Sequence, residues 1–242
     1  MAKLAAYDKA LDYSYCLGLY PSITLIQARP EAVKRLILHP ASAGNEGVLK
    51  LRALCAAQNV RAEEAERVLR RESRKDNCFA ALVFEKYECA LDPDGNHAVL
   101  AQISDGGNLG TALRALLGFG IRDVAVIRPC VDIFEPHALR ASMGAFFRMR
   151  VRVYDDFDQY RAAFPAHALY PFLLDGARPL GAVVREKSAP YSLIFGNEAA
   201  GLPAEFASIG TSVYIPHSDE IDSLNLAVAV AIGAYAFTSK GE

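Results

Sequence analysis

A polar turn that runs directly into an apolar stretch is the segment best placed to bind and transform a small molecule. Residues 215–237 read IPHSDEIDSLNLAVAVAIGAYAF, with Ser223 and Asn225 just ahead of the apolar run. Because the run is apolar on every side of a helix, we expect that helix to be buried, with the polar groups at its start beside the core. Small-molecule pockets are usually built in this way. Taken alone, Ser223 would be only a helix N-cap.

Two further segments place glycines and polar residues at the ends of apolar runs. Residues 193–203 read LIFGNEAAGLP, an apolar strand followed by a Gly-Asn-Glu turn and a further glycine. Residues 104–121 read SDGGNLGTALRALLGFGI, a glycine-rich turn that opens a helix with one arginine, Arg114. On that helix Arg114 lies about 140° from Leu109 and leaves the centre of the apolar stripe, so it can face a substrate.

Together and in this order, the three segments resemble the SpoU-type, TrmH-like RNA ribose methyltransferases of the SPOUT superfamily. The pattern of that family is an Asn-x-Gly-x-x-x-Arg helix, then a Gly-Asn/Ser-Glu-x-x-Gly loop, then Ile-Pro followed by Ser-Leu-Asn, and all three match. Residues 141–145, ASMGA, also resemble the family's Ser-x-Gly-Ala element. The resemblance covers residues 98–237, and a weaker likeness links residues 13–88 to a ribosomal-protein-like, RNA-binding domain.

The resemblance implies an enzyme that uses S-adenosylmethionine to methylate a ribose 2′-hydroxyl of tRNA or rRNA. It also implies a homodimer whose site is completed across the interface. The alternative is a non-catalytic RNA-binding or ribosome-assembly factor that retains the fold. The residues implied to be catalytic are Asn108, Arg114, Glu198, Ser223 and Asn225. The residues implied to bind the cofactor are Phe195, Gly196, Asn197, Gly201, Ile215, Ser223, Leu224 and Asn225. We expect no metal, because the sequence has no metal-ligand spacing.

The residue types suit these implied roles. The family assigns Arg114 to ribose or phosphate and proposes it as a base. A guanidinium holds its proton to above about pH 12, so we favour a phosphate clamp that stabilises the developing alkoxide. Asn108 is placed to cap its helix, and the resemblance implies that it also orients the substrate or Arg114. We expect Glu198 to position other groups, and Gly196 to let a cofactor approach the backbone closely.

The elements that must position these residues alternate between strand and helix. The strand-like runs are continuous and apolar, as in strands covered on both faces, and they lie at 98–103, 123–127, 169–174, 192–195 and 212–215. This alternation predicts an α/β fold with a mainly parallel sheet flanked by helices, whose ligands bind beyond the carboxyl ends of the strands. The resemblance adds a C-terminal trefoil knot. A nucleotide-dependent oxidoreductase is disfavoured because the glycines do not form G-x-G-x-x-G.

The chain is expected to form two domains. Residues 91–97, LDPDGNH, concentrate turn-forming residues between apolar runs, so we place the boundary there. This gives a smaller, RNA-binding-like α/β domain over residues 1–94 and a SPOUT methyltransferase domain over residues 95–242. In the first domain, helical patterns at 31–37, 46–58 and 63–71 alternate with apolar runs at 23–26 and 80–84.

From the composition, we expect a protein of the reducing cytoplasm. The five cysteines of the 242-residue chain are odd in number and contain no Cys-x-x-Cys, which disfavours a secreted framework and a zinc site. The apolar runs are too short to span a bilayer, so we expect no membrane partner. Net charge is only −2, but between Arg114 and Arg152 seven arginines accompany three acidic residues, a local charge of +4. A local basic patch is what contact with RNA phosphates requires.

Overall fold

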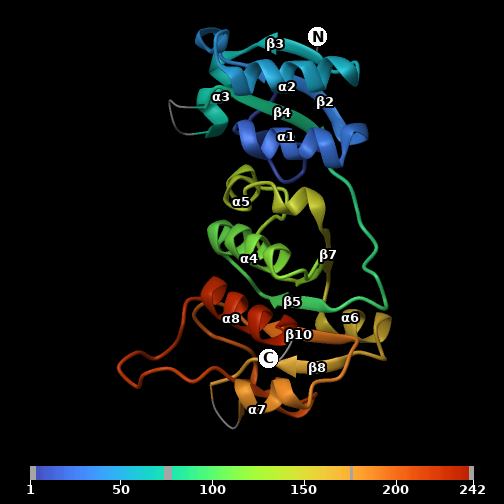
Figure 1. Cartoon of the computed structure of the whole chain (residues 1–242), viewed down its shortest axis with the longest axis vertical. Coiled ribbons are helices and arrows are strands. Elements are labelled where there is room, and N and C mark those ends of the chain that lie inside the picture. Colours follow the sequence, from blue (N-terminus) through green and yellow to red (C-terminus); the bar gives the residue numbers. More distant parts are fainter. Residues whose placement is uncertain (1–3, 74–77, 175–176, 240–242) are drawn as a thin grey trace. The chain divides into compact units, whose positions relative to one another are not determined.

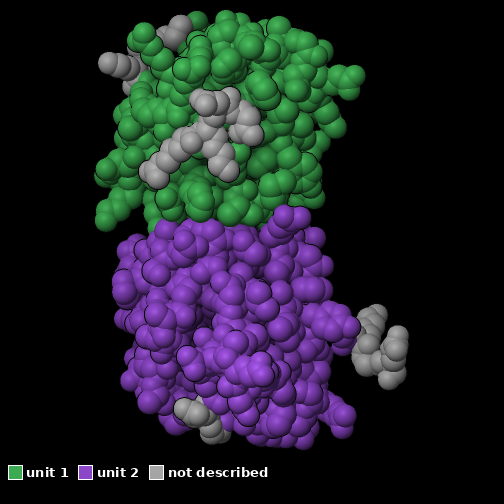
Figure 2. Space-filling model, turned by 90° about the vertical axis from the view of Figure 1, so that its left-hand side faces the viewer, with its two compact units in different colours: residues 1–87, 132–148 green, residues 88–131, 149–242 purple. Residues whose placement is uncertain are grey.

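Two compact units make up the computed structural model, which describes residues 4–73, 78–174 and 177–239. The first unit consists of residues 1–87 with 132–148, and the second of residues 88–131 with 149–242, as coloured in Figure 2. The sequence division at residue 94 therefore lies close to the first junction, but it leaves residues 132–148 in the other part of the chain.

A four-stranded sheet forms the centre of the first unit, in the order β1-β4-β2-β3. The strands are β1 (Tyr13–Leu17), β2 (Val33–Leu38), β3 (Arg61–Glu64) and β4 (Ala80–Glu85). Its helices are α1 (Leu19–Ala28), α2 (Glu46–Ala57) and α3 (Glu66–Ser73), with short 3-10 turns at Pro30–Ala32 and Pro40–Ser42 (Figure 1).

Two sequence predictions for this unit are wrong. The helix expected over 31–37 is mostly strand β2, and the strand-like run at 23–26 lies inside helix α1. The spacing of apolar residues in VKRLIL is compatible with both a helix and a strand. These residues form a strand because β2 pairs with both β4 and β3. Helix α2 and strand β4 lie where the sequence predicted them.

Residues 132–148 belong to the first unit because their aromatic side chains complete its core. Phe147 of the 3-10 turn Ala145–Arg148 packs edge-on against Phe84 of β4, with ring centroids 5.4 Å apart. Helix α5 (Pro136–Ala141) leads into this turn. Gly144 has a φ of 83°, and a Cβ there would lie 2.8 Å from the Cβ of Thr24 on α1. The ASMGA element thus acts as a packing element within this unit.

A five-stranded parallel sheet forms the second unit, in the order β7-β6-β5-β10-β8. The strands are β5 (His97–Ala101), β6 (Asp123–Ile127), β7 (Arg150–Tyr154), β8 (Ala168–Pro171) and β10 (Tyr191–Phe195). A separate parallel pair joins β9 (Arg178–Pro179) to β11 (Val213–Tyr214). The α/β class and the mainly parallel sheet are confirmed, whereas the trefoil knot stays a prediction.

Helices cover both faces of this sheet. They are α4 (Gly106–Gly118), α6 (Phe157–Ala163), α7 (Leu180–Arg185) and α8 (Leu226–Thr238), with a 3-10 turn at Ala204–Ser208. Helix α8 approaches Phe195 of β10, while α6 packs with the neighbouring Ile194. Successive residues of a strand face opposite sides, so α8 and α6 lie on opposite faces (Figure 1). None of the helices in the described ranges is long and apolar enough to cross a membrane.

The expectation that the C-terminal helix is buried on every side is wrong. Val230 and Ala234 of α8 are fully buried, but Val228 is 47% exposed and Tyr235 is 60% exposed. Phe119, just after α4, is partly exposed and its ring lies 5.7 Å from that of Tyr235. In a single copy of the chain, one side of α8 therefore presents an apolar strip to solvent.

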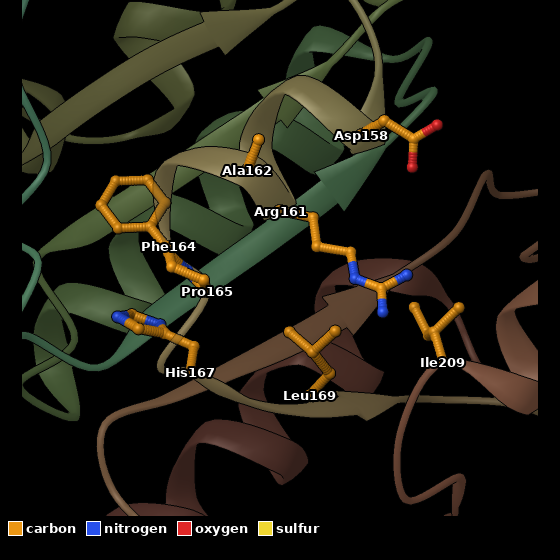
Figure 3. A pocket seen from close by; sticks show the side chains of 8 residues that line it. All are labelled: Asp158, Arg161, Ala162, Phe164, Pro165, His167, Leu169 and Ile209. Carbon is orange, nitrogen blue, oxygen red and sulfur yellow. The ribbon is translucent and has the colours of Figure 1, made fainter.

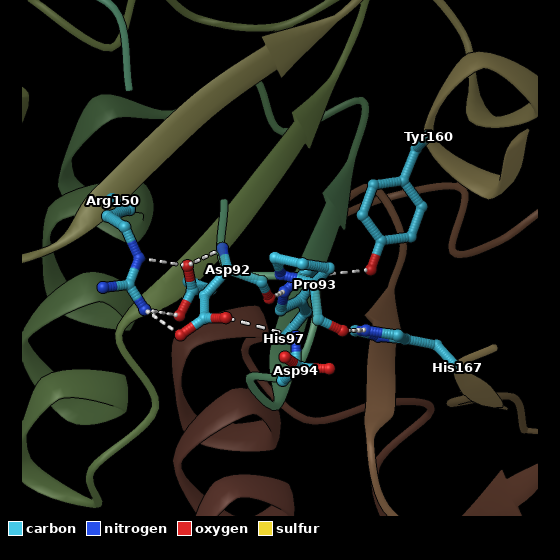
Figure 4. Close-up of polar contacts among 8 residues, drawn as sticks. Asp92, Pro93, Asp94, His97, Arg150, Tyr160 and His167 are labelled. Carbon is cyan, nitrogen blue, oxygen red and sulfur yellow. Dashed lines mark hydrogen bonds and ion pairs between the residues drawn. The ribbon is translucent and has the colours of Figure 1, made fainter. Parts of the chain in front are cut away.

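A chain of buried polar side chains joins the amino ends of β5 and β10. Figure 4 shows three of its members, His97, Tyr160 and His167. His97 Nδ1 lies 2.9 Å from the Tyr160 hydroxyl, which lies 2.6 Å from Ser192 Oγ, and Ser192 Oγ lies 2.9 Å from His167 Nδ1. His97 Nε2 lies 2.7 Å from the backbone carbonyl oxygen of Asp92, and His167 Nε2 lies 2.9 Å from that of Pro93. A carbonyl only accepts, so each imidazole donates its Nε2–H there.

Stability should fall in mild acid because of His97. Burial lowers the pKa of His97 to about 4, whereas the unfolded chain takes up this proton near 6.5. Stability from the neutral imidazole is therefore complete above about pH 6.5 and is lost as the pH falls toward 4. In urea titrations, we expect the free energy of unfolding to fall by about 2 kcal/mol between about pH 7.5 and 5 from this group.

A neutral side chain at this position isolates the effect. His97→Gln should be less stable at pH 7.5 but should show a flatter dependence on pH, whereas His137→Gln, at an exposed position, should keep the wild-type slope. Equal slopes for wild type and His97→Gln would contradict the prediction.

Candidate active site

The parallel pairing of β5 with β10 brings two of the motif-bearing turns together. Phe195, at the end of β10, pairs with Leu100 of β5, so the turns that follow both strands emerge at the same edge. The Glu198 carboxylate accepts from the backbone N–H groups of Ser104 and Asp105 at 3.3 and 3.2 Å. It also accepts from the Ser104 hydroxyl at 3.1 Å. One carboxylate therefore fixes the spacing between the two turns.

The hydrogen-bond donors around Glu198 keep it ionised. Partial burial raises the pKa of Glu198, but backbone N–H groups and the Asn108 side chain together outweigh burial and hold the pKa below its ordinary value. A carboxylate in this state accepts hydrogen bonds and carries a negative charge at neutral pH. Glu198 is thus built to position its neighbours and to attract cations.

Asn108 links Glu198 to the third motif. Its Nδ2 donates to Glu198 at 3.3 Å, and its Oδ1 accepts from Asn225 Nδ2 at 3.1 Å. The predicted capping role of Asn108 is wrong, because Asp105 caps α4 by accepting the Asn108 backbone N–H at 2.6 Å. The helix begins earlier than expected, which leaves the Asn108 amide free to join the three motifs.

Asn225, and not Ser223, caps the C-terminal helix. Asn225 Oδ1 accepts from the backbone N–H groups of Ala227 and Val228 at 2.9 and 3.4 Å. The same side chain therefore starts α8 and touches Asn108. Ser223 lies two residues ahead of the cap and remains exposed.

The Gly-Asn-Glu turn folds back on itself. Asn197 and Gly201 exchange two backbone hydrogen bonds of 3.0 Å, and Gly201 adopts a φ of 68°. A Cβ on Gly196 would lie 2.2 Å from the carbonyl carbon of Gly201, so only glycine fits there. The closest neighbour of Gly196 is thus the protein's own backbone, which gives this glycine a structural reason besides the expected approach of a cofactor.

A cavity of about 550 Å³ has Glu198 in its wall. Its apolar wall includes Phe172, Leu173, Phe195, Val213 and Leu226. Its ionisable side chains are Glu198, His217 and Asp222, and no lysine or arginine is among the lining residues of the described chain. The cavity thus combines an apolar wall with an excess of carboxylates, which suits a partly apolar ligand that carries positive charge.

A second cavity, of about 500 Å³, contains none of the motif residues. It lies between α6 and the start of β8, where the Arg161 side chain extends toward Leu169 and Ile209 (Figure 3). His167 also lines it, but both ring nitrogens of His167 are already bonded. The first cavity is therefore the candidate active site.

The model of the SpoU rRNA Methylase family matches residues 95–235, which is more than half of the chain. The chain belongs to this family. The family expected from the three motifs is thus confirmed.

Relatives within and near the SpoU family support the same assignment. The chain is 31% identical over 136 residues to the 23S rRNA (guanosine(2553)-2′-O)-methyltransferase RlmP of Bacillus subtilis, covering 55% of this chain and 54% of that protein. It is 29% identical over 170 residues to an uncharacterized tRNA/rRNA methyltransferase of Synechocystis, covering 66% of this chain and 59% of that protein. The chain spans less than two thirds of the length of these curated relatives.

Solved structures extend the likeness to nearly the whole chain. The AdoMet-bound rRNA methyltransferase from Sinorhizobium meliloti is 25% identical, with a TM-score of 0.78. The match covers 93% of this chain and 87% of that chain. Its span includes most of both units, so the SpoU part and the preceding sheet occur together in another protein.

Most of the residues expected at a SpoU site come together in this chain. Asn108, Glu198 and Asn225 form one connected group. Of the residues expected to bind the cofactor, all but Asn225 line the larger cavity, namely Phe195, Gly196, Asn197, Gly201, Ile215, Ser223 and Leu224. Asn225 contributes instead through the helix cap and its contact with Asn108.

Arg114 is not brought to this group. It lies on the exposed side of α4, and no hydrogen bond or ion pair joins it to another residue of the described ranges. Counting at about 100° per residue, Arg114 lies about 120° around α4 from Asn108. Within one copy of the chain, Arg114 therefore faces outward, away from the Asn108 side of the helix.

Sequence reasoning missed two ionisable residues of the cavity, His217 and Asp222. Both lie in the spacer between Ile-Pro and Ser-Leu-Asn, where Asp219 and Glu220 are equally polar but do not line the cavity. Composition could have flagged the spacer as polar. Which of its side chains turn inward depends on the path of the loop.

Proposed function

We propose that this protein is an S-adenosylmethionine-dependent RNA 2′-O-methyltransferase that acts on tRNA or rRNA in the cytoplasm. The observation that carries the proposal is the connected group Glu198–Asn108–Asn225, which ties all three motif segments together beside a cavity of about 550 Å³. Membership of the SpoU family and the names of its relatives support the same activity.

The larger cavity fits the cofactor chemically. S-adenosylmethionine, when bound, supplies an electrophilic methyl group on a sulfonium cation. Two carboxylates, Glu198 and Asp222, line the cavity, and no lysine or arginine is among the described lining positions, which favours a cation. The stacked rings of Phe172 and Phe195, with centroids 4.3 Å apart, offer an apolar wall suited to a flat base.

The chain's own residues would bind and orient the reactants. Glu198 and Asn108 hold the turns after β5 and β10 in register, so that donor and acceptor would meet in a fixed geometry. Asn225 sets the start of α8 and thereby the position of Ser223 and Leu224 at the cavity. Arg114 would clamp an RNA phosphate and stabilise the developing alkoxide from outside the cavity.

A binder that retains the fold without turnover is the second candidate. It would need no cofactor cavity and no carboxylate held by several donors beside it. The connected group therefore favours the enzyme. Part of the arginine-rich segment between Arg114 and Arg152 forms ion pairs within the protein and is compatible with both candidates. Arg150 pairs with the buried Asp123, and Arg128 pairs with Asp155.

The partner that completes the site is a second copy of the chain. The exposed apolar strip of Val228 and Tyr235 on α8, with Phe119 beside it, would be covered by such a partner. Helix α4, which carries Arg114, packs against α8. A dimer formed through this region would carry Arg114 of one copy toward the other, which agrees with its absence from the connected group of its own chain.

Transfer of labelled methyl groups to cellular RNA tests the proposed activity. RNA from cells that lack the protein should accept label from S-adenosylmethionine in the presence of the purified protein. Nucleoside analysis should place the label on ribose, and mapping of 2′-O-methyl sites in cells with and without the protein should identify the nucleotide. Label only on bases, or only on protein, would overturn the assignment to ribose.

Loss of Arg114 should affect transfer and leave the fold intact. Arg114→Ala should reduce methyl transfer by a factor on the order of 100, because one electrostatic stabiliser is removed. Thermal unfolding and cofactor affinity should stay near wild type, since Arg114 is exposed and is not among the residues that line the cavity. Arg114→Lys should recover little, because lysine lacks the planar fork. Near-normal turnover with collapsed cofactor affinity would reverse this division of roles.

Mixing two inactive variants tests the shared site. Arg114→Ala and Glu198→Ala, refolded together, should form mixed dimers in which one site combines Arg114 of one copy with Glu198 of the other. Such a mixture should recover about a quarter of wild-type activity, because half of the dimers are mixed and each has one intact site. Each variant alone should stay inactive. A monomer mass by sedimentation, or a mixture without activity, would contradict a site shared between two copies.

A further inference from the structure

His217 occupies a position in the larger cavity to which no motif assigns a role. It lies in the spacer of the third motif, half-buried, with its ring 5.6 Å from the Tyr214 ring. Its Nδ1 lies 2.8 Å from the carbonyl oxygen of Ile215. A carbonyl oxygen only accepts, so Nδ1 carries a proton and Nε2 is the nitrogen left to gain or lose one.

The ionisable groups around His217 make its charge matter for binding. Glu198 enters the cavity from the turn after β10, and Asp222 enters from the same spacer as His217. Tyr214, on the strand β11, is a further titratable residue whose ring lies against the imidazole ring. With a neutral imidazole the cavity carries two negative charges, and a proton on His217 cancels one of them. Imidazole is the side chain whose charge ordinarily changes between about pH 5 and 8.

We propose that His217 controls how tightly the cavity holds a cationic ligand as the pH changes. The inference rests on the proposed function, in which that ligand is S-adenosylmethionine with its sulfonium cation. A neutral His217 leaves the field of both carboxylates acting on the sulfonium. A protonated His217 adds a positive charge to the same cavity wall and weakens binding. Since charges within one partly shielded cavity interact by roughly 1 kcal/mol or more, we expect an effect on the order of 5-fold or more in affinity.

A comparison of two ligands isolates the charge. S-adenosylhomocysteine has the same adenosine and amino-acid groups, but its sulfur is a neutral thioether. Calorimetric dissociation constants for both ligands, measured with the full chain between pH 7.5 and 5.5, give their affinity ratio at each pH. In wild type, the ratio should shift against S-adenosylmethionine by on the order of 5-fold as the pH falls. His217→Gln should flatten this shift, and His137→Gln, an exposed histidine of the first unit, should preserve it.

The outcomes separate this inference from the proposed function. A ratio that stays constant with pH in wild type, or that shifts equally in wild type and His217→Gln, would overturn the role of His217 while leaving the cofactor assignment in place. Absence of binding by both ligands at pH 7.5 would overturn the proposed function itself, and this inference with it. Thermal unfolding of His217→Gln at each pH checks that the variant stays folded during the measurements.

Discussion

A partly buried carboxylate stays ionised only when hydrogen-bond donors surround it, and this constraint shapes the whole site. The donors around Glu198 come largely from the turn of residues 104–108, which lies 90 to 94 residues earlier in the chain. That turn can reach Glu198 only if β5 and β10 are neighbours with parallel direction, as they are. Asn108, which donates to Glu198, also accepts a hydrogen bond from Asn225, so the same carboxylate helps to position the start of α8. The pairing of β5 with β10 thus brings the donor groups of one turn within hydrogen-bond distance of Glu198.

Glycines make the close approaches that this arrangement requires. The turn after β10 doubles back so tightly that a side chain at Gly196 would overlap the backbone of Gly201. Helix α8 also approaches the cavity wall closely, because a Cβ on Gly233 would lie 2.7 Å from the Phe172 ring and 3.0 Å from the Phe195 ring. Close packing at these two glycines therefore shapes parts of the cavity wall. A preorganised cavity of this kind holds a ligand without first ordering its own loops.

The sequence predicted the parts of the site that depend on local pattern. The strand-turn-helix segments around Glu198 and Asn108 follow from apolar runs that end in glycine and polar residues, and the parallel sheet follows from their alternation with helices. Residues whose role depends on distant partners were harder. Val33 to Leu38 fit a helical spacing until pairing with β4 made them a strand. Residues 132–148 joined the first unit through contacts such as Phe84–Phe147, which no local pattern encodes. His217 was missed because the path of a loop decides which polar side chain faces the cavity.

In the proposed function, the charge of the cavity limits where RNA could be held. Glu198 and Asp222 favour a sulfonium cation, and the same two carboxylates repel the phosphates of an RNA strand. In the proposed reaction, the cationic group that binds phosphate would therefore stand outside the cavity wall, and only the ribose hydroxyl would reach the methyl donor. Arg114 meets this requirement, since it is exposed and makes no ion pair within the described ranges. In the proposed dimer, separating cofactor and phosphate contacts between two copies would keep the two opposite charges from neutralising each other before the RNA arrives.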